Sequence, residues 1–335
     1  MMKLKALPIF LLCVLALSGC GKKSAGEKAL PQVSKMKLAC DASFENIIDQ
    51  EIDVFEYTYS TPKRQAYVIP YYMPQQQCFD SLLDPDSGVK TIVAARRLTD
   101  AEKIRLKNRR RKPREQRIAV DAIALIVNKD NPQDVISMQE LRDILSGKVA
   151  SWHDMWPTKL DSIRLVFDQN GSSLYQFMRD SINGGKPLAA KIYAENSSRE
   201  VFDVVSRHPN ALGLIGVSWI TTDMNGAVIS REEMRERSTV SDTTALTFSK
   251  DIKVLAVSGD ESIEAFKPYQ AYIFDGRYPL YRSIYMITHT VGGTLDNAFY
   301  AFVTGMQGQK VIQMTGVLPA TVQPRMVNVT TAGSE

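Results

Sequence analysis

The stretch from residue 163 to residue 181 changes its apolar spacing from that of a strand to that of a helix. Apolar residues first alternate with their neighbours and then recur every three or four positions, at Ile163, Leu165 and Phe167 and then at Leu174, Phe177 and Met178. The first period is that of a half-buried strand and the second is that of an amphipathic helix. The pattern therefore predicts a strand, a turn at Gly171 and a helix that begins near Ser172.

Strand-like and helix-like patterns alternate along most of the chain. Strands are expected at 36–40, 54–60, 66–72, 91–94, 118–128, 163–167, 211–217, 252–257 and 283–288. Helices are expected to begin near residues 44, 78, 99, 137, 172, 200, 295 and 308. The strand at 118–128 is continuously apolar, which is typical of a strand covered on both faces. This alternation predicts an α/β fold with largely parallel strands.

Two of the expected helices begin at polar turns that could hold an anion. Ser172 and Ser173 follow one strand, and Ala42, Ser43 and Phe44 follow another. The first backbone N–H groups of a helix have no partner within it and lie at the positive end of its dipole. Hydroxyls and amides there can bind an oxyanion together, although the serines could also serve only as helix caps.

The first twenty residues have the composition of an export signal. Lys3 and Lys5 precede an apolar run that ends at Leu17 and is too short to span a membrane. The sequence Leu17-Ser18-Gly19-Cys20 resembles a bacterial lipobox, which implies cleavage before Cys20 and lipid attachment to its sulfur. We therefore expect a signal peptide at 1–19, a polar tether at 20–35, and a protein anchored by its lipid to the outer side of a membrane.

The charge distribution argues against nucleic acid as a partner. The formal net charge is only +4, and loss of Lys3 and Lys5 with a signal peptide lowers it by two. Nine of the fifteen residues from Lys103 to Arg117 are basic, but Pro113 interrupts this run and no aromatic residue lies within it. A solvated helix and loop is the expected structure, and a membrane or an acidic protein surface is an alternative partner.

The residues that usually carry enzyme or metal chemistry are sparse. His153, His208 and His289 are far apart, and no Gly-x-Ser-x-Gly motif occurs. No metal site, no cofactor and no catalytic residue is therefore predicted. Outside the first twenty residues there are two cysteines, Cys40 and Cys78, and their spacing leaves both a disulfide and free buried thiols open.

Six segments of the chain occur in a specific order. They are AVDAIALIVNKDNP (119–132), LRDILSGKVASWHD (141–154), FDQNGSSLYQF (167–177), NALGLIGVSWI (210–220), YPLYRSIY (278–285) and GQKVIQMTGVLP (308–319). In this order they resemble segments of the phosphate-binding lipoproteins that supply ABC importers. The resemblance implies a type II periplasmic-binding-protein fold, in which two lobes with mainly parallel or mixed sheets are joined by a two-segment hinge. The expected boundaries are 36–125 with 276–330 for one lobe and 126–275 for the other.

The resemblance also implies which residues bind the ligand between the lobes. The candidates are Ala42, Ser43, Phe44, Arg96, Ser172, Ser173 and Ser197. Two positions depart from the family pattern, because Asp168 stands where an arginine is usual and Leu174 where a threonine is usual. An added carboxylate predicts weaker binding of a multiply charged anion, unless Asp168 accepts the proton of a monohydrogen phosphate.

These observations predict a substrate-binding lipoprotein of the cell envelope and not an enzyme. Its expected partners are phosphate or a similar small oxyanion, the permease subunits of an ABC importer, and the membrane through an N-terminal lipid. The alternative is an envelope scaffold or sensor that has the same fold and altered or lost ligand binding. A phosphatase or related hydrolase is disfavoured because the usual metal ligands are missing from the sequence.

Overall fold

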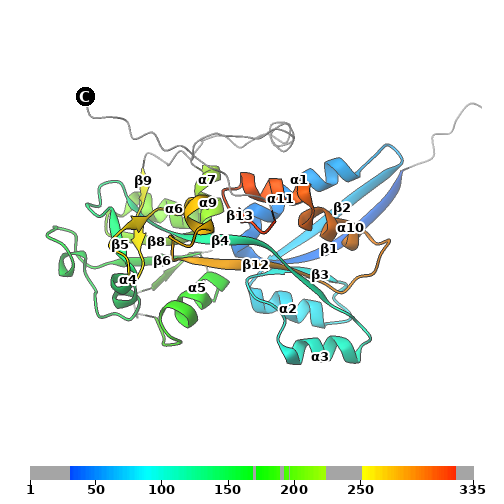
Figure 1. The fold of residues 1–335 in the computed structure, drawn as a ribbon, viewed down its shortest axis with the longest axis horizontal. Helices are drawn as coiled ribbons and strands as arrows, with labels where there is room; N and C mark the ends of the chain where they lie inside the picture. Colours follow the sequence, from blue (N-terminus) through cyan, green and yellow to red (C-terminus); the bar gives the residue numbers. More distant parts are fainter. Residues whose placement is uncertain (1–30, 169–170, 189–191, 196, 224–250, 322–335) are drawn as a thin grey trace, which may run out of the picture.

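The computed structural model describes residues 31–168, 171–188, 192–195, 197–223 and 251–321. The predicted signal peptide, the tether up to residue 30, Cys20 and the end of the chain beyond 321 lie outside these residues. A mixed sheet forms the centre of the described part, in the order β2-β1-β3-β12-β4-β8-β6-β7 (Figure 1). Its strands are β1 (Gln32–Asp41), β2 (Arg64–Met73), β3 (Thr91–Ala94), β4 (Arg114–Asn128), β6 (Arg164–Phe167), β7 (Ile192–Ala194), β8 (Ala211–Gly216) and β12 (Tyr281–Thr288).

The long strand β4 joins two groups of strands. Its residues 114–122 pair with β12, and β13 (Leu318–Pro319) pairs with Ala119 and Val120. Its residues 123–128 pair with β8 and with β9 (Ile252–Val254). We call β1, β2, β3, β12 and β13 the first strand group, and β6, β7, β8 and β9 the second. A separate small sheet contains β5 (Val135–Ser137), β10 (Ala256–Ser258) and β11 (Ala265–Phe266).

Strand direction differs between the outer and central parts of the sheet. The pairs β1–β2, β1–β3, β6–β7 and β6–β8 are parallel. The central pairs β3–β12, β4–β12 and β4–β8 are antiparallel. The sheet is therefore mixed, one of the arrangements that the sequence predicted, and the expectation of largely parallel pairing is met only in the outer strands.

Helices cover both faces of each strand group (Figure 1). On the first group, α1 (Glu45–Tyr59), α10 (Leu295–Thr304) and α11 (Met306–Met314) cover one face, and α2 (Gln75–Leu83) and α3 (Asp100–Asn108) cover the other. On the second group, α6 (Ser198–Arg207) lies on one face, while α4 (Met138–Leu145) and α5 (Ser173–Phe177) lie on the other. Both faces of β4 are thus covered, and residues 118–128 are all buried.

The remaining helical elements are short. They are α7 (Val217–Asp223), α9 (Gln270–Phe274), two 3₁₀ turns at Ala42–Phe44 and Trp152–Asp154, and a π-helical turn at Met178–Ile182 that continues α5.

Helix starts agree with the sequence wherever the signal is local. Thr99 with Glu102, and Ser137 with Glu140, each form a capping box, in which each side chain accepts from the other residue's backbone N–H. Ser172 caps α5, and Gly171 adopts the positive φ of +77° that the predicted turn needs. These predictions are confirmed.

Two predicted strands are wrong. Residues 54–60 were expected to be a strand because aromatic residues alternate there, but they form the end of α1. The wider pattern of Ile48, Ile52 and Phe55 is helical, and the helix stacks Phe55 on Tyr59 with ring centroids 4.9 Å apart. Residues 252–257 were expected to be one strand, but they split into β9 and β10, which belong to different sheets.

Close packing of α6 against the sheet depends on a glycine in β8. A Cβ atom at Gly213 would lie 2.7 Å from a methyl group of Val205 and 2.8 Å from Ile126. We predict that Gly213→Ala lowers the free energy of unfolding by about 1–3 kcal/mol, as overpacked cores do. Urea unfolding measures this change. Gly259→Ala is the control, because its Cβ would meet nothing within 4 Å, and an equal effect of both variants would contradict the prediction.

Candidate anion-binding site

Serine hydroxyls from both strand groups meet at one buried carboxylate. Ser43, after β1, donates to Asp168 Oδ2 at 2.8 Å, and Ser172, before α5, donates to Asp168 Oδ1 at 2.7 Å. All three residues are buried. Ser43 and Asp168 are 125 positions apart in the chain. The two polar turns that the sequence singled out therefore lie together, and Asp168, which stands where the family usually has an arginine, lies between them.

The turn at Ala42–Phe44 places Ser43. Asp41 ends β1, and its carboxylate accepts a hydrogen bond from the backbone N–H of Ser43 at 3.1 Å. This bond caps the 3₁₀ turn that leads into α1. Phe44 is fully buried, and its ring centroid lies 4.6 Å from the guanidinium carbon of Arg282. Phe44 therefore packs in the core against Arg282, while the hydroxyl of Ser43 donates to Asp168.

The turn at Gly171 places Ser172 and Ser173. Ser172 accepts from the backbone N–H of Tyr175 at 3.1 Å while its own hydroxyl donates to Asp168. Ser173 accepts from Nη1 of Arg282 at 2.7 Å. Capping and side-chain binding thus occur together at these serines, so the two interpretations offered by the sequence do not exclude each other.

An ion pair between β4 and β12, the two strands that cross the middle of the sheet, lies beside the serines. Arg282 of β12 and Asp121 of β4 are direct partners in the strand register, and Nε and Nη2 of Arg282 both lie 3.2 Å from Asp121 Oδ2. The two side chains are 2% and 1% exposed. Neither residue was predicted for the site. The available signal was a single charge in each of two apolar strand segments, since buried charges are normally paired.

Burial dominates the electrostatics of these carboxylates. It raises the pKa of Asp121 to about 6, although Arg282 opposes the shift by its charge and hydrogen bonds. Burial also raises the pKa of Asp41, and Arg282 and a hydrogen bond from Ser173 oppose it. The negative charge of Asp168 raises the pKa of Asp41 further, and that of Asp41 raises the pKa of Asp121. The site therefore disfavours additional negative charge.

Further contacts hold the beginning of α1 against the second strand group. The indole N–H of Trp219 donates to the backbone oxygen of Ser43 at 3.4 Å, and the side chain of Asn46 donates to the backbone oxygen of Ser218 at 2.9 Å. Gln75 of α2 donates to Gln176 of α5 at 3.4 Å. The two groups are therefore in contact through several side chains besides the Ser43–Asp168 bond.

Arg96 is engaged by an acid of its own segment. Its guanidinium makes two hydrogen bonds to Glu102, each 2.9 Å long, and stacks on Phe79 with its central carbon 3.5 Å from the ring centroid. These contacts lower the pKa of Glu102 despite its partial burial. The structure does not bring the guanidinium to the serines.

Ser197 acts as a helix cap. It is the N-cap of α6 and accepts from the backbone N–H of Glu200 at 3.4 Å. Ser198 is the buried first residue of the same helix. No hydrogen bond of either side chain to Ser43, Ser172 or Asp168 occurs among the described contacts.

Cys40 and Cys78 are buried free thiols. Burial raises the pKa of both, and each is further raised by a nearby negative group, so neither is activated as a nucleophile. In the part of the chain that the structure describes, no group of three or more histidine, cysteine, aspartate or glutamate side chains could hold a metal ion.

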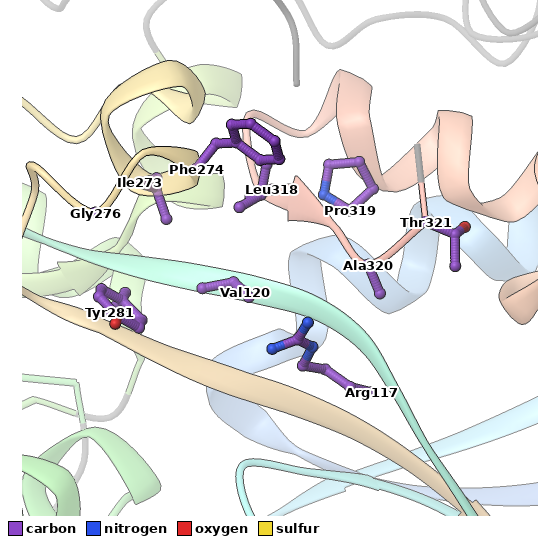
Figure 2. Close-up of a pocket in the computed structure, with 10 residues that line it drawn as sticks. All are labelled: Arg117, Val120, Ile273, Phe274, Gly276, Tyr281, Leu318, Pro319, Ala320 and Thr321. Carbon is purple, nitrogen blue, oxygen red and sulfur yellow. The ribbon is translucent and has the colours of Figure 1, made fainter. Parts of the chain in front are cut away.

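A separate pocket of about 480 Å³ lies by β4 and β12 (Figure 2). It is lined by Arg117, Val120, Ile273, Phe274, Gly276, Tyr281, Leu318, Pro319, Ala320 and Thr321. Val120 and Tyr281 precede Asp121 and Arg282 in their strands, and successive strand residues point to opposite faces. The pocket therefore opens on the other side of the crossing strands and contains none of the predicted site residues.

A family model described as PBP superfamily domain matches residues 25–306. Among curated proteins, the phosphate-binding protein PstS of Staphylococcus aureus (strain bovine RF122 / ET3-1) is 24% identical over 197 residues, or 58% of this chain and 51% of the relative. PstS of Staphylococcus saprophyticus is 25% identical over 200 residues, or 58% of this chain and 53% of the relative. The chain spans about half the length of the curated relatives it matches.

Solved structures share the fold at low sequence identity. A Clostridium perfringens protein assigned as a phosphate ABC transporter substrate-binding protein, with bound phosphate, matches with a TM-score of 0.62 and 18% identity, covering 86% of this chain and all of the other. An ABC-type phosphate transport receptor from Vibrio cholerae matches with a TM-score of 0.58 and 17% identity, covering 85% of this chain and 100% of the other. These matches establish the fold.

The raised pKa of Asp121 predicts a pH dependence of stability. Its ordinary pKa is 3.8 and its folded pKa is about 6, so between these values the folded state binds more protons than the unfolded chain. The free energy of unfolding must then fall as pH rises from about 4 to about 6, by about 3 kcal/mol from this group. Asp41 and Glu51, whose pKa values burial also raises, contribute with the same sign.

Asp121→Asn isolates the contribution of this one carboxyl group. Urea unfolding at pH 4, 5, 6 and 7 should show a smaller fall of stability in the variant than in the parent protein. An identical pH slope in both proteins would contradict the assignment of this titration to Asp121.

Proposed function

The chain belongs to the PBP superfamily, and from this premise we propose that it is an extracytoplasmic substrate-binding lipoprotein that captures phosphate or a similar small oxyanion for an ABC importer. The names of its curated relatives and of its structural neighbours, which refer to phosphate binding and phosphate transport, support this proposal. The relatives are named as binding proteins, which also supports a function without catalysis.

One observation carries the proposal. The hydroxyls of Ser43 and Ser172, from separate strand groups, converge on the two oxygens of one carboxylate. A carboxylate is itself a small oxyanion, so this geometry is that of an oxyanion site. Neutral hydroxyls suit a buried anion because charge-assisted hydrogen bonds are short and strong. We assign Ala42, Ser43, Phe44, Ser172 and Ser173 to the ligand site. Arg96 and Ser197, which the sequence also predicted for it, bond instead to Glu102 and to the backbone N–H of Glu200.

We further propose that the two strand groups correspond to two lobes, 36–125 with 276–330 and 126–275. Strand β4 pairs with strands of both groups, and the chain returns from the second group into β12 at Tyr281, so β4 and the beginning of β12 would form the hinge. Contacts of Ser43 and Asn46 with the second group are those expected of lobes that close on a ligand. Closure of this kind removes a bound anion from water.

Attachment to the envelope would depend on the N-terminal lipid. No helix within the described ranges is long and apolar enough to cross a membrane. The lipobox-like sequence that ends in Cys20 supplies an alternative anchor. The tether expected at 20–35 would end before β1, which begins at Gln32. The importer's permease subunits are the proposed protein partners.

A scaffold or sensor with lost ligand binding is the second candidate function. The observation that favours it is the position of Asp168, whose carboxylate lies where the anion would bind. Measurement of oxyanion binding separates this candidate from the first.

Titration calorimetry with inorganic phosphate and sulfate tests the capture of an oxyanion. We predict a phosphate dissociation constant in the micromolar range or below, and about tenfold weaker binding by Ser43→Ala or Ser172→Ala, because each variant removes a donor. Ser146→Ala is the control, since its exposed hydroxyl donates to the backbone oxygen of Asp143 in its own helix. Absence of heat with both anions would favour the scaffold or sensor.

Metabolic labelling with a radioactive fatty acid tests the anchor. We predict that the parent protein takes up the label and sediments with membranes, and that Cys20→Ser removes both properties because the acceptor sulfur is lost. Cys78→Ser serves as the control, since Cys78 lies in the buried core. Labelling of the Cys20→Ser protein would exclude the proposed anchor.

A further inference from the structure

We propose that the Asp168 carboxylate is an internal ligand of the serine site, so that an external oxyanion must displace it to bind. This inference rests on the proposed oxyanion site and adds a residue that sets its affinity and selectivity. The sequence comparison alone suggests that Asp168 weakens binding or accepts a ligand proton; the geometry points to a third role, occupation of the site itself.

The geometry of Asp168 is that of a bound ligand. Each of its two oxygens accepts a hydrogen bond from one serine, at 2.8 Å from Ser43 and 2.7 Å from Ser172. The side chain is buried, and the residue is 3% exposed. The two donors come from elements that an external ligand would also have to bridge, so the carboxylate makes the cross-group contacts that an oxyanion would make.

The charges around Asp168 oppose the binding of a second anion beside it. Burial raises the pKa values of Asp41 and Asp121, the charge of Asp168 raises that of Asp41 further, and the charge of Asp41 raises that of Asp121. Arg282 is already bonded to Asp121 and Ser173. A phosphate dianion beside an ionised Asp168 would meet strong repulsion in this poorly solvated region. Binding of phosphate and retention of the Asp168 carboxylate between the serines therefore exclude each other.

Competition by the Asp168 carboxylate lowers the affinity of the site for an external oxyanion, although Ser43 and Ser172 are unchanged. A side chain held beside its donors acts at a high effective concentration. The apparent dissociation constant of an external ligand increases in proportion as the competent, uncovered state becomes rarer. Only an oxyanion that bonds the serines better than a carboxylate does can then displace Asp168, which makes this residue a determinant of selectivity.

Removal of the carboxylate tests the inference. Asp168→Ala empties the position, and Asp168→Asn keeps the shape while removing the charge. Asp180→Asn is the matched control, because Asp180 is exposed in the π-helical turn after α5 and pairs with Arg179. The probes are inorganic phosphate and sodium acetate, with binding measured by calorimetry and by the ligand-induced shift of the melting temperature.

Internal ligation predicts that Asp168→Ala binds phosphate at least about tenfold more tightly than the parent protein. Acetate, which replaces the missing carboxylate, should raise the melting temperature of Asp168→Ala but not that of the parent or of Asp180→Asn. Asp168→Asn should bind phosphate more tightly than the parent, since the charge repulsion is gone, and it provides the comparison if the alanine variant does not fold.

Weaker binding of phosphate by Asp168→Asn than by the parent would overturn the inference, because Asp168 would then be a contact of the external ligand. Equal binding by the parent and both variants would overturn it as well. If acetate stabilises Asp168→Ala while phosphate binds neither protein, internal ligation stands and the proposed capture of phosphate fails. The two hypotheses therefore have separate outcomes.

Discussion

A buried carboxylate must be given hydrogen-bond donors, and at Asp168 these come from two segments that only the folded chain brings together. Ser43 follows a strand near the beginning of the sequence, and Ser172 begins a helix of the second strand group. Loss of either donor would leave charge in a poorly solvated place, which costs more than the hydrogen bond gains. The packing of α1 against the second group depends on the same bonds, because Asn46 and the backbone of Ser43 make their contacts in the same place.

The charge balance of the site follows from its position between crossing strands. Asp121 and Arg282 face each other across the β4–β12 ladder and are fully removed from water. Such a pair gains little net stability, since desolvation offsets its attraction, but it orients the groups around it. Arg282 reaches Ser173 and lies over Phe44, so one side chain links both predicted turns. The ion pair thus positions the site through the contacts of Arg282 with Ser173 and Phe44.

Local signals made much of the fold predictable. The capping boxes of Thr99 and Ser137, the turn at Gly171 and the buried strand of β4 each depend on a few neighbouring residues. The strand expected at 54–60 failed because aromatic alternation is a weaker signal than the helical spacing that precedes it. The resemblance to a known family supplied the arrangement of the elements, which local patterns do not contain.

The candidate site was predictable in part. Ser43 and Ser172 could be chosen because each stands at a helix start after a strand. The pairing of Asp121 with Arg282 could not be derived from spacing, since the residues are 161 positions apart and meet only through the antiparallel register. Arg96 follows a buried strand, as a ligand-binding residue could, but it bonds Glu102, which belongs to the capping box of Thr99. A sequence pattern does not show which acidic group an arginine will pair with.

The continuity of β4 has a consequence for how the molecule comes apart. One unbroken strand of fifteen residues supplies hydrogen bonds first to β12 and β13 and then to β8 and β9. If either strand group unfolds, β4 loses its backbone hydrogen bonds to that group, and the apolar side chains of β4 that pack there become exposed to water. We therefore expect the described part of the chain to unfold as a single cooperative unit, even though the sequence enters one group, leaves it for the other, and returns.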